Sequence, residues 1–342
     1  MPKTASTITS PWKGRFNSGE VYMMNKIIML ARKLPRPVKV VLKYVIGILK
    51  NNIIKLLNSF GYDLQKIDLS IPIQEKKDLE LYERLYDKQS IKGKKFYNIG
   101  AGNFSHPYWT NIDKSSDWYG PLNPSSIDQD LFSILPIPIT SDTAEVIYTS
   151  HTIEHINNEA AEFLFAEAYR ILKKGGVFRV TCPDIDLEYR AYRDNDRDYF
   201  FWIDAYSQPD LIEKYKMKMP MSKASISQIF LAHFATHTSQ IFDAGVEDKI
   251  SDEEFDKIFR EMNYEDALNY CTSKCSLELQ KTNVGDHINW WNKAKIIRFL
   301  KNVGFNIAYE SAYAQSFCPV LRNTKYFDNT FPQISLYVEA VK

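Results

Sequence analysis

The stretch FYNIGAGNFSHPYWTNIDKS, residues 96–115, decides the fold. It places Gly100 and Gly102 directly after one apolar segment and Asp113 at the end of a second. In an open parallel sheet, ligands bind beyond the carboxyl ends of the strands, where glycine lets backbone amides approach a ligand that a Cβ would hold off. An acid at the end of the second strand can accept hydrogen bonds from ribose hydroxyls. The stretch therefore predicts a site for a nucleoside-containing cofactor.

Short apolar segments and helical patterns alternate around this stretch. Residues 96–99, 109–112, 146–149 and 177–181 are rich in β-branched or aromatic side chains, as buried parallel strands are. A helix between the last two is expected to begin at Asn157 or Asn158 and to end at Lys173, Lys174 and Gly175. The alternation lapses over residues 186–286 and returns with strands at 305–309 and 335–341. The pattern predicts one doubly wound α/β domain interrupted by a helical insertion.

Five segments are expected along the 342 residues: a flexible tail (1–20), a basic amphipathic helical arm (21–70), a cofactor-binding core (75–185), a helical substrate-binding insertion (186–286) and the rest of the core (287–342). Residues 21–62 hold eight Lys or Arg and no Asp or Glu. The apolar run 38–49 carries a narrow basic stripe, which suits a helix lying in a membrane interface through residues 21–60. A helix packed on the main domain or on a partner subunit fits this pattern equally well.

The composition indicates which partners and which cellular compartment to expect. A net charge of +1 argues against binding nucleic acid by bulk electrostatics, so no nucleic-acid partner is expected. Four scattered cysteines make no disulfide framework, which favours a reducing, cytoplasmic location. No secretory signal is visible, and the run 38–49 is too short to span a bilayer.

The glycine motif does not fit a pyrophosphate-binding loop. Ser105 stands where the dinucleotide fingerprint requires a third glycine, and the distance from Gly100 to Asp113 is too short for the usual helix and spacing. Around it, the segments NIGAGN, WTNID, DQDLFSILPI, EVIYTSHTIEHI, EAYRILKKGGVFRVTCPD, IIRFLKNVGFNI and SLYVEAVK occur in order. Together they resemble the class I S-adenosylmethionine-dependent methyltransferases, in particular the type 11-like branch, over residues 95–184 and 288–342.

This resemblance implies a Rossmann-like, mostly parallel seven-stranded sheet with S-adenosylmethionine as the cofactor. It also implies roles for single residues. Gly100 and Gly102 would contact the methionine part of the cofactor, Asp113 the ribose, and Asp130 with Leu131 the adenine, while His151 would face the sulfonium and the acceptor. The chain departs from the family pattern at Asn98, where an acid is usual, and at Asn103, where a third glycine is usual. Both remain in the expected cofactor site.

Methyl transfer from a sulfonium is an in-line displacement, which a general base assists when the acceptor is a hydroxyl. His151 and Asp184 are the candidate bases; for His151, a role in shaping the pocket is the alternative. Glu154 and His155 are expected to cap the following helix. His233 and His237, four residues apart, could share a helix face and bind a metal with Asp243, but histidines without a metal are the preferred interpretation. Cys271 and Cys275 lack a second ligand pair, so no metal site is predicted.

The sequence thus predicts a methyltransferase acting on a hydroxyl of a small molecule or glycan, with a nucleotide sugar or glycan of polysaccharide biosynthesis as first choice. The aromatic and charged segment 188–206 fits stacking on sugar rings. Two alternatives stay open: a non-catalytic S-adenosylmethionine-binding module at a membrane, and an NAD-dependent oxidoreductase or epimerase. The acceptor atom and the oligomeric state cannot be read from the sequence.

Overall fold

The computed structural model describes residues 73–115, 122, 125–243 and 249–342. The expected tail (1–20) and basic arm (21–70) lie outside these ranges. The chain divides into two units, Met1–Glu75 and Lys76–Lys342, and the second contains the whole described sheet. No helix within the described ranges combines the length and the apolar character that crossing a bilayer requires.

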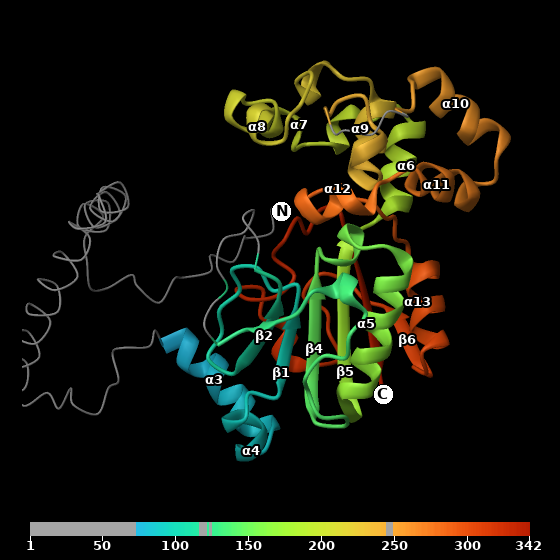
Figure 1. Cartoon of the computed structure of the whole chain (residues 1–342). Helices are drawn as coiled ribbons and strands as arrows, with labels where there is room; N and C mark the ends of the chain where they lie inside the picture. Colours follow the sequence, from blue (N-terminus) through green and yellow to red (C-terminus); the bar gives the residue numbers. More distant parts are fainter. Residues whose placement is uncertain (1–72, 116–121, 123–124, 244–248) are drawn as a thin grey trace, which may run out of the picture. The chain divides into compact units, whose positions relative to one another are not determined.

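The described residues form a single seven-stranded sheet in the order β3-β2-β1-β4-β5-β7-β6 (Figure 1). Strands β1 to β5 pair in parallel, whereas β7 runs antiparallel to both β5 and β6. This arrangement confirms the predicted doubly wound, mostly parallel Rossmann-like sheet. The strands are β1 (Phe96–Ile99), β2 (Trp109–Asp113), β3 (Ile127–Asp128), β4 (Ala144–Ser150), β5 (Leu172–Pro183), β6 (Ile307–Glu310) and β7 (Ser335–Val341).

The described helices lie before, between and after the strands. Short 3-10 helices are η2 (Leu131–Ser133), η3 (Ile153–His155), η4 (Arg197–Tyr199), η5 (Met221–Lys223), η6 (Thr236–Thr238) and η7 (Pro319–Arg322). The α-helices are α3 (Ile73–Leu85), α4 (Lys88–Lys92), α5 (Asn158–Ile171), α6 (Ile185–Arg193), α7 (Ile203–Tyr206), α8 (Pro209–Lys214), α9 (Ile226–Phe234), α10 (Asp252–Glu261), α11 (Tyr264–Ser273), α12 (Leu277–Thr282) and α13 (Lys293–Asn302).

Both faces of the sheet are covered, and the alternation of side chains along β1 shows how. Tyr97 and Ile99 join the apolar cluster beneath α5 and α13. Phe96 points the other way, into a cluster with Tyr82 of α3 and Phe327 of the C-terminal loops. Because successive side chains of a strand point to opposite faces, burial on both sides requires the nearly continuous apolar runs that the sequence contains.

The direction in which successive strands are added to the sheet reverses at β1, and this reversal determines where a ligand site is expected. β2 and β3 extend the sheet on one side of β1, and β4 and β5 on the other. Ile99 at the end of β1 pairs with Ile112 of β2 and with Thr149 of β4, so the three strands end at one edge. Ligands of such sheets bind in the crevice at this switch point.

Helices α6 to α12 enclose an apolar cluster of their own, rich in aromatic side chains such as Phe230 and Phe255. The segment before α13 joins this cluster to the sheet, since Trp290 is buried in the helical cluster and Trp291 in the sheet cluster. The ammonium of Lys295 lies 4.0 Å from the centroid of the Trp290 ring and 4.3 Å from that of Trp291. The segment boundaries predicted from the sequence are not tested by these contacts and stay a prediction.

One predicted boundary is wrong. Helix α5 ends at Ile171, and Leu172 is already extended and pairs with Ala144 of β4. The residues expected to end the helix, Lys173 to Gly175, instead begin β5. The reason is a distant contact: Gly175 N donates to Lys342 O at 2.8 Å, and Lys342 N donates to Gly176 O at 3.1 Å. Pairing with the C-terminal residue therefore draws Lys173 to Gly175 into β5, although their local sequence is typical of a helix end.

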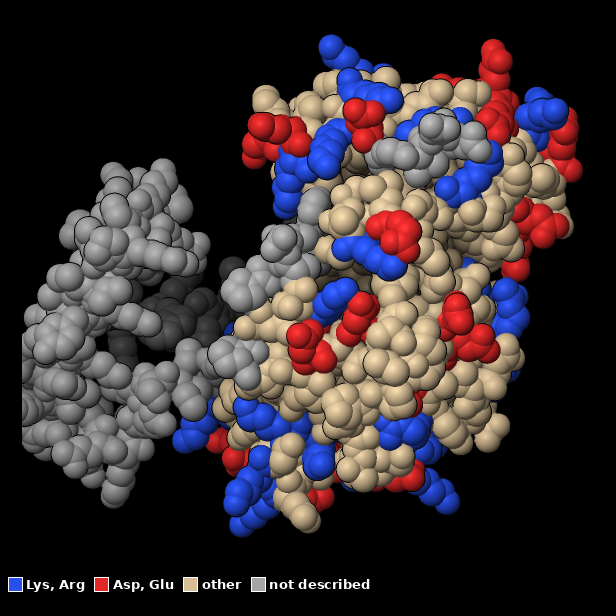
Figure 2. Space-filling model, viewed as in Figure 1, with Lys and Arg blue, Asp and Glu red and all other residues tan. Residues whose placement is uncertain are grey.

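Charges of both signs are scattered over the face shown in Figure 2, on the sheet part and on the helical part alike. Within the described residues of this face, neither sign forms a continuous block. Large single-sign patches are what proteins that bind nucleic acid by bulk electrostatics display.

Candidate active site

A cavity of about 570 Å³ lies where the carboxyl ends of β1, β2 and β4 meet the helices α7 to α9. Gly100, Asp113 and His151 line it from the sheet, and Trp202 and His233 line it from the helical part. This volume falls in the range of roughly 300–1,000 Å³ that is usual for ligand sites. Of the sequence-predicted residues, the cavity brings together Gly100, Gly102, Asp113, Asp130, Leu131 and His151.

The two glycines are required for different reasons. Gly100 has φ +68°, and a Cβ there would lie 2.2 Å from Oγ1 of Thr152. Gly102 has φ +50°, but a Cβ there would meet nothing within 4 Å. Its amide donates to Oδ2 of Asp113 at 2.6 Å, which ties the loop to the end of β2. The left-handed backbone conformation favours glycine at both positions, and close packing excludes a side chain only at Gly100.

Asp113 and Asp130 stand on the same rim of the cavity. Oδ1 of Asp113 accepts a hydrogen bond from the amide of Lys114 at 2.7 Å. The ammonium of Lys114 lies 2.6 Å from Oδ2 of Asp130, whose Oδ1 accepts from Phe132 N and caps η2. Within the described ranges, the carboxylate of Asp113 accepts hydrogen bonds from two backbone amides, and a carboxylate has about four lone-pair sites for donors. Leu131 follows in η2 and adds an apolar contact surface.

His151 directly follows β4 and has φ +50°, a conformation that is uncommon for a residue with a Cβ. Its amide donates to Thr181 O of β5 at 2.9 Å, which holds the residue in place. On the ring, Nε2 lies 2.8 Å from Oγ of Ser335, and Nδ1 lies 3.2 Å from Oε1 of Glu154. Backbone strain of this kind clusters at functional sites, where the surrounding structure imposes it.

Glu154 and His155 do not cap α5, so this expectation is wrong. Asn157 performs that role by accepting a hydrogen bond from Ala160 N at 3.0 Å. Glu154 and His155 lie in η3, and both side chains line the cavity. Burial alone would raise the pKa of Glu154, but the hydrogen bond and charge of His151, with the charges of the other nearby imidazoles, outweigh burial and hold it at about 2. The carboxyl group is therefore ionised at neutral pH.

His233 and His287 complete a group of imidazoles on the cavity wall. Burial lowers the pKa of each to about 3, so both rings are neutral at physiological pH. Nδ1 of His233 lies 2.7 Å from Oε1 of Glu188, whose pKa burial raises well above its usual range. Burial thus disfavours the ionised form of this pair. The ring of His233 also stacks on Trp202, with centroids 4.6 Å apart.

The metal hypothesis for His233, His237 and Asp243 is not supported by their placement. Helix α9 ends at Phe234, so His237 lies in η6 and shares no helix face with His233. Nε2 of His237 lies 3.3 Å from Asp286, while Asp243 pairs with Lys218. Of the two cysteines, Cys271 lies in α11 and Cys275 lies beyond its end.

Three predicted site residues do not line the cavity. Asn98 is buried within β1, and its Oδ1 has no hydrogen-bond partner among the described residues. Asn103 is exposed in the loop after Gly102. Asp184 caps α6 by accepting from Asp186 N at 3.1 Å, and burial, with nearby acids adding to it, raises its pKa to about 6. Their proposed roles stay untested.

Sequence reasoning missed other side chains of the site. Thr152 packs against Gly100, and Ser335 contacts His151 across 184 positions of the chain. No local pattern could join two such distant residues. The segment HTIEHI, by contrast, shows an acid between two histidines, and this signal could have been used.

Comparison with known proteins finds a family that one segment of the chain resembles. Residues 113–180 match the family described as methyltransferase domain. The solved structure of an S-adenosylmethionine-dependent methyltransferase from Archaeoglobus fulgidus is 10% identical, with a TM-score of 0.33, and the alignment covers 78% of this chain and 94% of that one. One from Mesorhizobium loti is 12% identical, with a TM-score of 0.32, over 72% and 90% of the two chains. Curated proteins give no match to this sequence.

The matched residues begin at the acid that ends β2 and run through β4 into β5. They thus include Asp113, Asp130 and His151, three of the side chains that line the cavity. The cavity lies at the switch point of a sheet whose β7 is antiparallel. The glycines, the carboxylate of Asp113 and the cavity volume fit a nucleoside cofactor. Residues 113–180 are thus similar to the methyltransferase domain family, and the sheet topology and the position of the cavity agree with that similarity.

Proposed function

We propose that the chain is an S-adenosylmethionine-dependent methyltransferase that transfers the methyl group of the cofactor to a hydroxyl of a glycan or nucleotide sugar, with His151 as the general base. The observation that carries this proposal is the position of His151. It follows the end of β4 and lines the same cavity as the expected cofactor residues of the sheet and the side chains of the helical part. S-adenosylmethionine supplies an electrophilic methyl group on a positively charged sulfur.

The chain's own residues contribute orientation first. The loop of Gly100 and Gly102 and the carboxylate of Asp113 would hold the cofactor at the strand ends, and the helical wall would hold the acceptor opposite. In-line displacement depends on this alignment more than on any change in the protein's charge state.

His151 would then receive the proton of the acceptor hydroxyl at Nε2. Ser335, its present partner at Nε2, has two other hydrogen-bond acceptors, Phe331 O at 2.8 Å and Thr330 O at 3.1 Å. The serine hydroxyl therefore stays satisfied when the imidazole turns to the acceptor. Glu154, 3.2 Å from Nδ1, is a positioning residue that stabilises the imidazolium formed by this proton transfer.

The choice of a sugar acceptor rests on the aromatic wall of the cavity. Trp202, Tyr206, Tyr215 and Phe331 line it, and such rings stack on the apolar faces of sugars. We accordingly assign acceptor binding to the helical insertion, residues 186–286. A cytoplasmic enzyme of polysaccharide biosynthesis would meet such acceptors at the inner membrane face, where the basic residues 21–60 would give peripheral contact.

The test is turnover with a panel of acceptors. The full chain is incubated with S-adenosylmethionine and nucleotide sugars, oligosaccharides or non-sugar hydroxyl compounds, and S-adenosylhomocysteine is measured. We expect release with a sugar acceptor, and a decrease in kcat of about 10²–10⁴ for His151→Gln with little change in cofactor affinity. His106→Gln, outside the cavity, is the control. Turnover only with non-sugar acceptors would contradict the acceptor class, and an unchanged kcat in His151→Gln would exclude it as base. Cofactor binding without any turnover would favour the binding-module alternative.

A further inference from the structure

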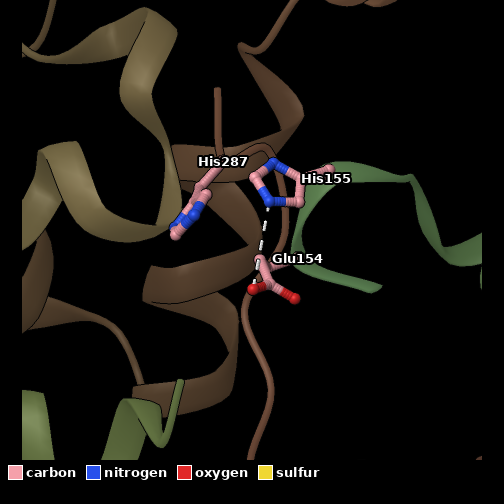
Figure 3. Close-up of side chains that lie close together, drawn as sticks. All are labelled: Glu154, His155 and His287. Carbon is pink, nitrogen blue, oxygen red and sulfur yellow. Dashed lines mark ion pairs between the residues drawn. The ribbon is translucent and has the colours of Figure 1, made fainter. Parts of the chain in front are cut away.

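Three side chains with metal-ligating atoms converge in the cavity wall. Glu154 and His155 come from η3, and His287 comes from the segment after α12 (Figure 3). One ligand atom from each lies within 4.8 Å of the other two. The rings of the two histidines are 4.6 Å apart at their centroids. The function proposed above uses neither histidine.

Hydrogen bonds fix which nitrogen of each ring keeps a lone pair for an ion. Nδ1 of His155 lies 3.0 Å from Asp286 O, and Nδ1 of His287 lies 2.6 Å from His233 O. A carbonyl oxygen only accepts, so each Nδ1 carries the hydrogen and each neutral ring presents a lone pair at Nε2. Histidines that bind metals usually donate their other ring N–H to a carbonyl or carboxylate in this manner.

Glu154 supplies a buried carboxylate that His151 compensates only in part. Its side chain is 2% exposed, and neither carboxylate oxygen receives a well-aligned hydrogen bond from any described residue. The nearest nitrogens are Nδ1 of His151 at 3.2 Å and Nε2 of His155 at 4.0 Å. In this tautomer Nε2 of His155 carries no hydrogen, so it donates no hydrogen bond to the carboxylate. A buried carboxylate with so few donors keeps unfilled acceptor sites, which is costly, and a cation would fill them.

We propose that Glu154, His155 and His287 bind one divalent first-row transition-metal ion, of the Zn²⁺ type, in the cavity wall beside His151. Two imidazoles and one carboxylate suit such an ion, whereas Mg²⁺ and Ca²⁺ prefer oxygen ligands. Such an ion holds nitrogen and oxygen at about 2.0–2.2 Å, so binding would draw the three ligand atoms closer by roughly 1 Å. Three protein ligands leave a coordination position open toward the cavity.

The open position gives the ion a role in the proposed reaction. A hydroxyl bound there would be polarised and more acidic, and its proton would pass to Nε2 of His151 before or as the oxygen takes the methyl group. This role rests on the proposed function. Binding of the ion does not, because it depends only on the three side chains.

The experiment measures metal binding without any acceptor. The full chain is freed of metal with a chelator, then titrated with Zn²⁺ by calorimetry and with Co²⁺ by visible absorption. Glu154→Gln and His287→Gln remove a ligand each, and His155→Gln serves if one of these fails to fold. His106→Gln is the matched control, since this buried histidine packs against Tyr82 and does not line the cavity. Titration with S-adenosylmethionine checks that each variant is folded.

We expect one ion per chain for the unmodified protein and for His106→Gln. The ligand variants should bind the ion more weakly by at least the roughly 10–100-fold that loss of an outer-shell partner costs, while still binding S-adenosylmethionine. No binding by the unmodified chain, or equal affinity in the folded ligand variants, would overturn the proposal. Because no acceptor is present, a wrong acceptor assignment leaves these results unaffected.

Discussion

At the scale of single residues, Gly100 shows how closely the cofactor loop is packed. A methyl group there would overlap Thr152, in addition to the cost of a left-handed backbone. We expect Gly100→Ala to lower both the melting temperature and the affinity for S-adenosylmethionine. Gly102→Ala is the control, because it shares the positive φ but has open space around it, and should cost only about 1–2 kcal/mol of stability. Calorimetry measures the affinity for S-adenosylmethionine, and thermal unfolding measures the melting temperature. If both variants lose equal amounts in these two measurements, the side chain of Thr152 must move aside to accommodate the methyl group.

A second residue-scale prediction concerns pH. Burial raises the pKa of Asp184 from 3.8 to about 6, so the folded state holds this proton more tightly than the unfolded state does. Stability should therefore fall as pH rises from about 4 to 6, by up to about 3 kcal/mol from this group. In Asp184→Asn, which can still accept from Asp186 N, that decline should be absent.

Chemical unfolding at pH 4 and pH 7 measures the difference for Asp184. The variant should match the unmodified protein at the lower pH and exceed it at the higher one. Turnover should persist in the variant, since the side chain does not line the cavity. A variant that is folded but inactive would restore Asp184 as a candidate base.

At the scale of elements, a buried ion network joins β5 to β7. Arg179 lies 2.6 Å from Asp328 and 2.9 Å from Glu339, and all three side chains are fully buried. Removing one partner leaves a buried charge uncompensated, so Asp328→Ala should lower the free energy of unfolding by about 3–5 kcal/mol. The exposed pair of Lys293 and Glu310 is the control, and Glu310→Ala should cost no more than about 1 kcal/mol. Denaturant unfolding compares the two, and similar losses would contradict this assignment.

The elements also show how far the sequence predicts the structure. Strands β1 and β7 and the Asn157 cap follow from local patterns, because a short, continuously buried apolar run and a cap are each encoded within a few residues. The end of α5 does not, since the C-terminal Lys342 decides it. The cofactor rim was predictable from glycines and acids at strand ends. The imidazole cluster was not, because His287 reaches Glu154 only through the packing of the helical part.

At the scale of the whole described unit, Trp290 and Trp291 join two apolar clusters. Each indole N–H is satisfied, by Asn269 Oδ1 and by Ile153 O, both at 2.9 Å. We expect the sheet and the helical part to unfold together. Trp290→Ala should cost about 3–5 kcal/mol and make far-UV and near-UV dichroism report separate transitions.

The control for this whole-unit prediction is Phe201→Ala, since Phe201 is 50% exposed. It should change stability by no more than about 0.5 kcal/mol and leave one transition. Coincident transitions in Trp290→Ala would mean that other contacts suffice to couple the two clusters.

The stacking of Trp202 on His233 has a consequence for observing the enzyme at work. Of the four tryptophans in the described part of the chain, Trp109, Trp202, Trp290 and Trp291, only Trp202 lines the cavity. Indole emission depends on the polarity around the ring and on neighbouring groups that quench it. A ligand or an ion that displaces solvent or moves His233 would therefore change the fluorescence of Trp202. The protein carries an intrinsic optical reporter, so arrival of a cofactor, a metal ion and an acceptor could each be timed without any label.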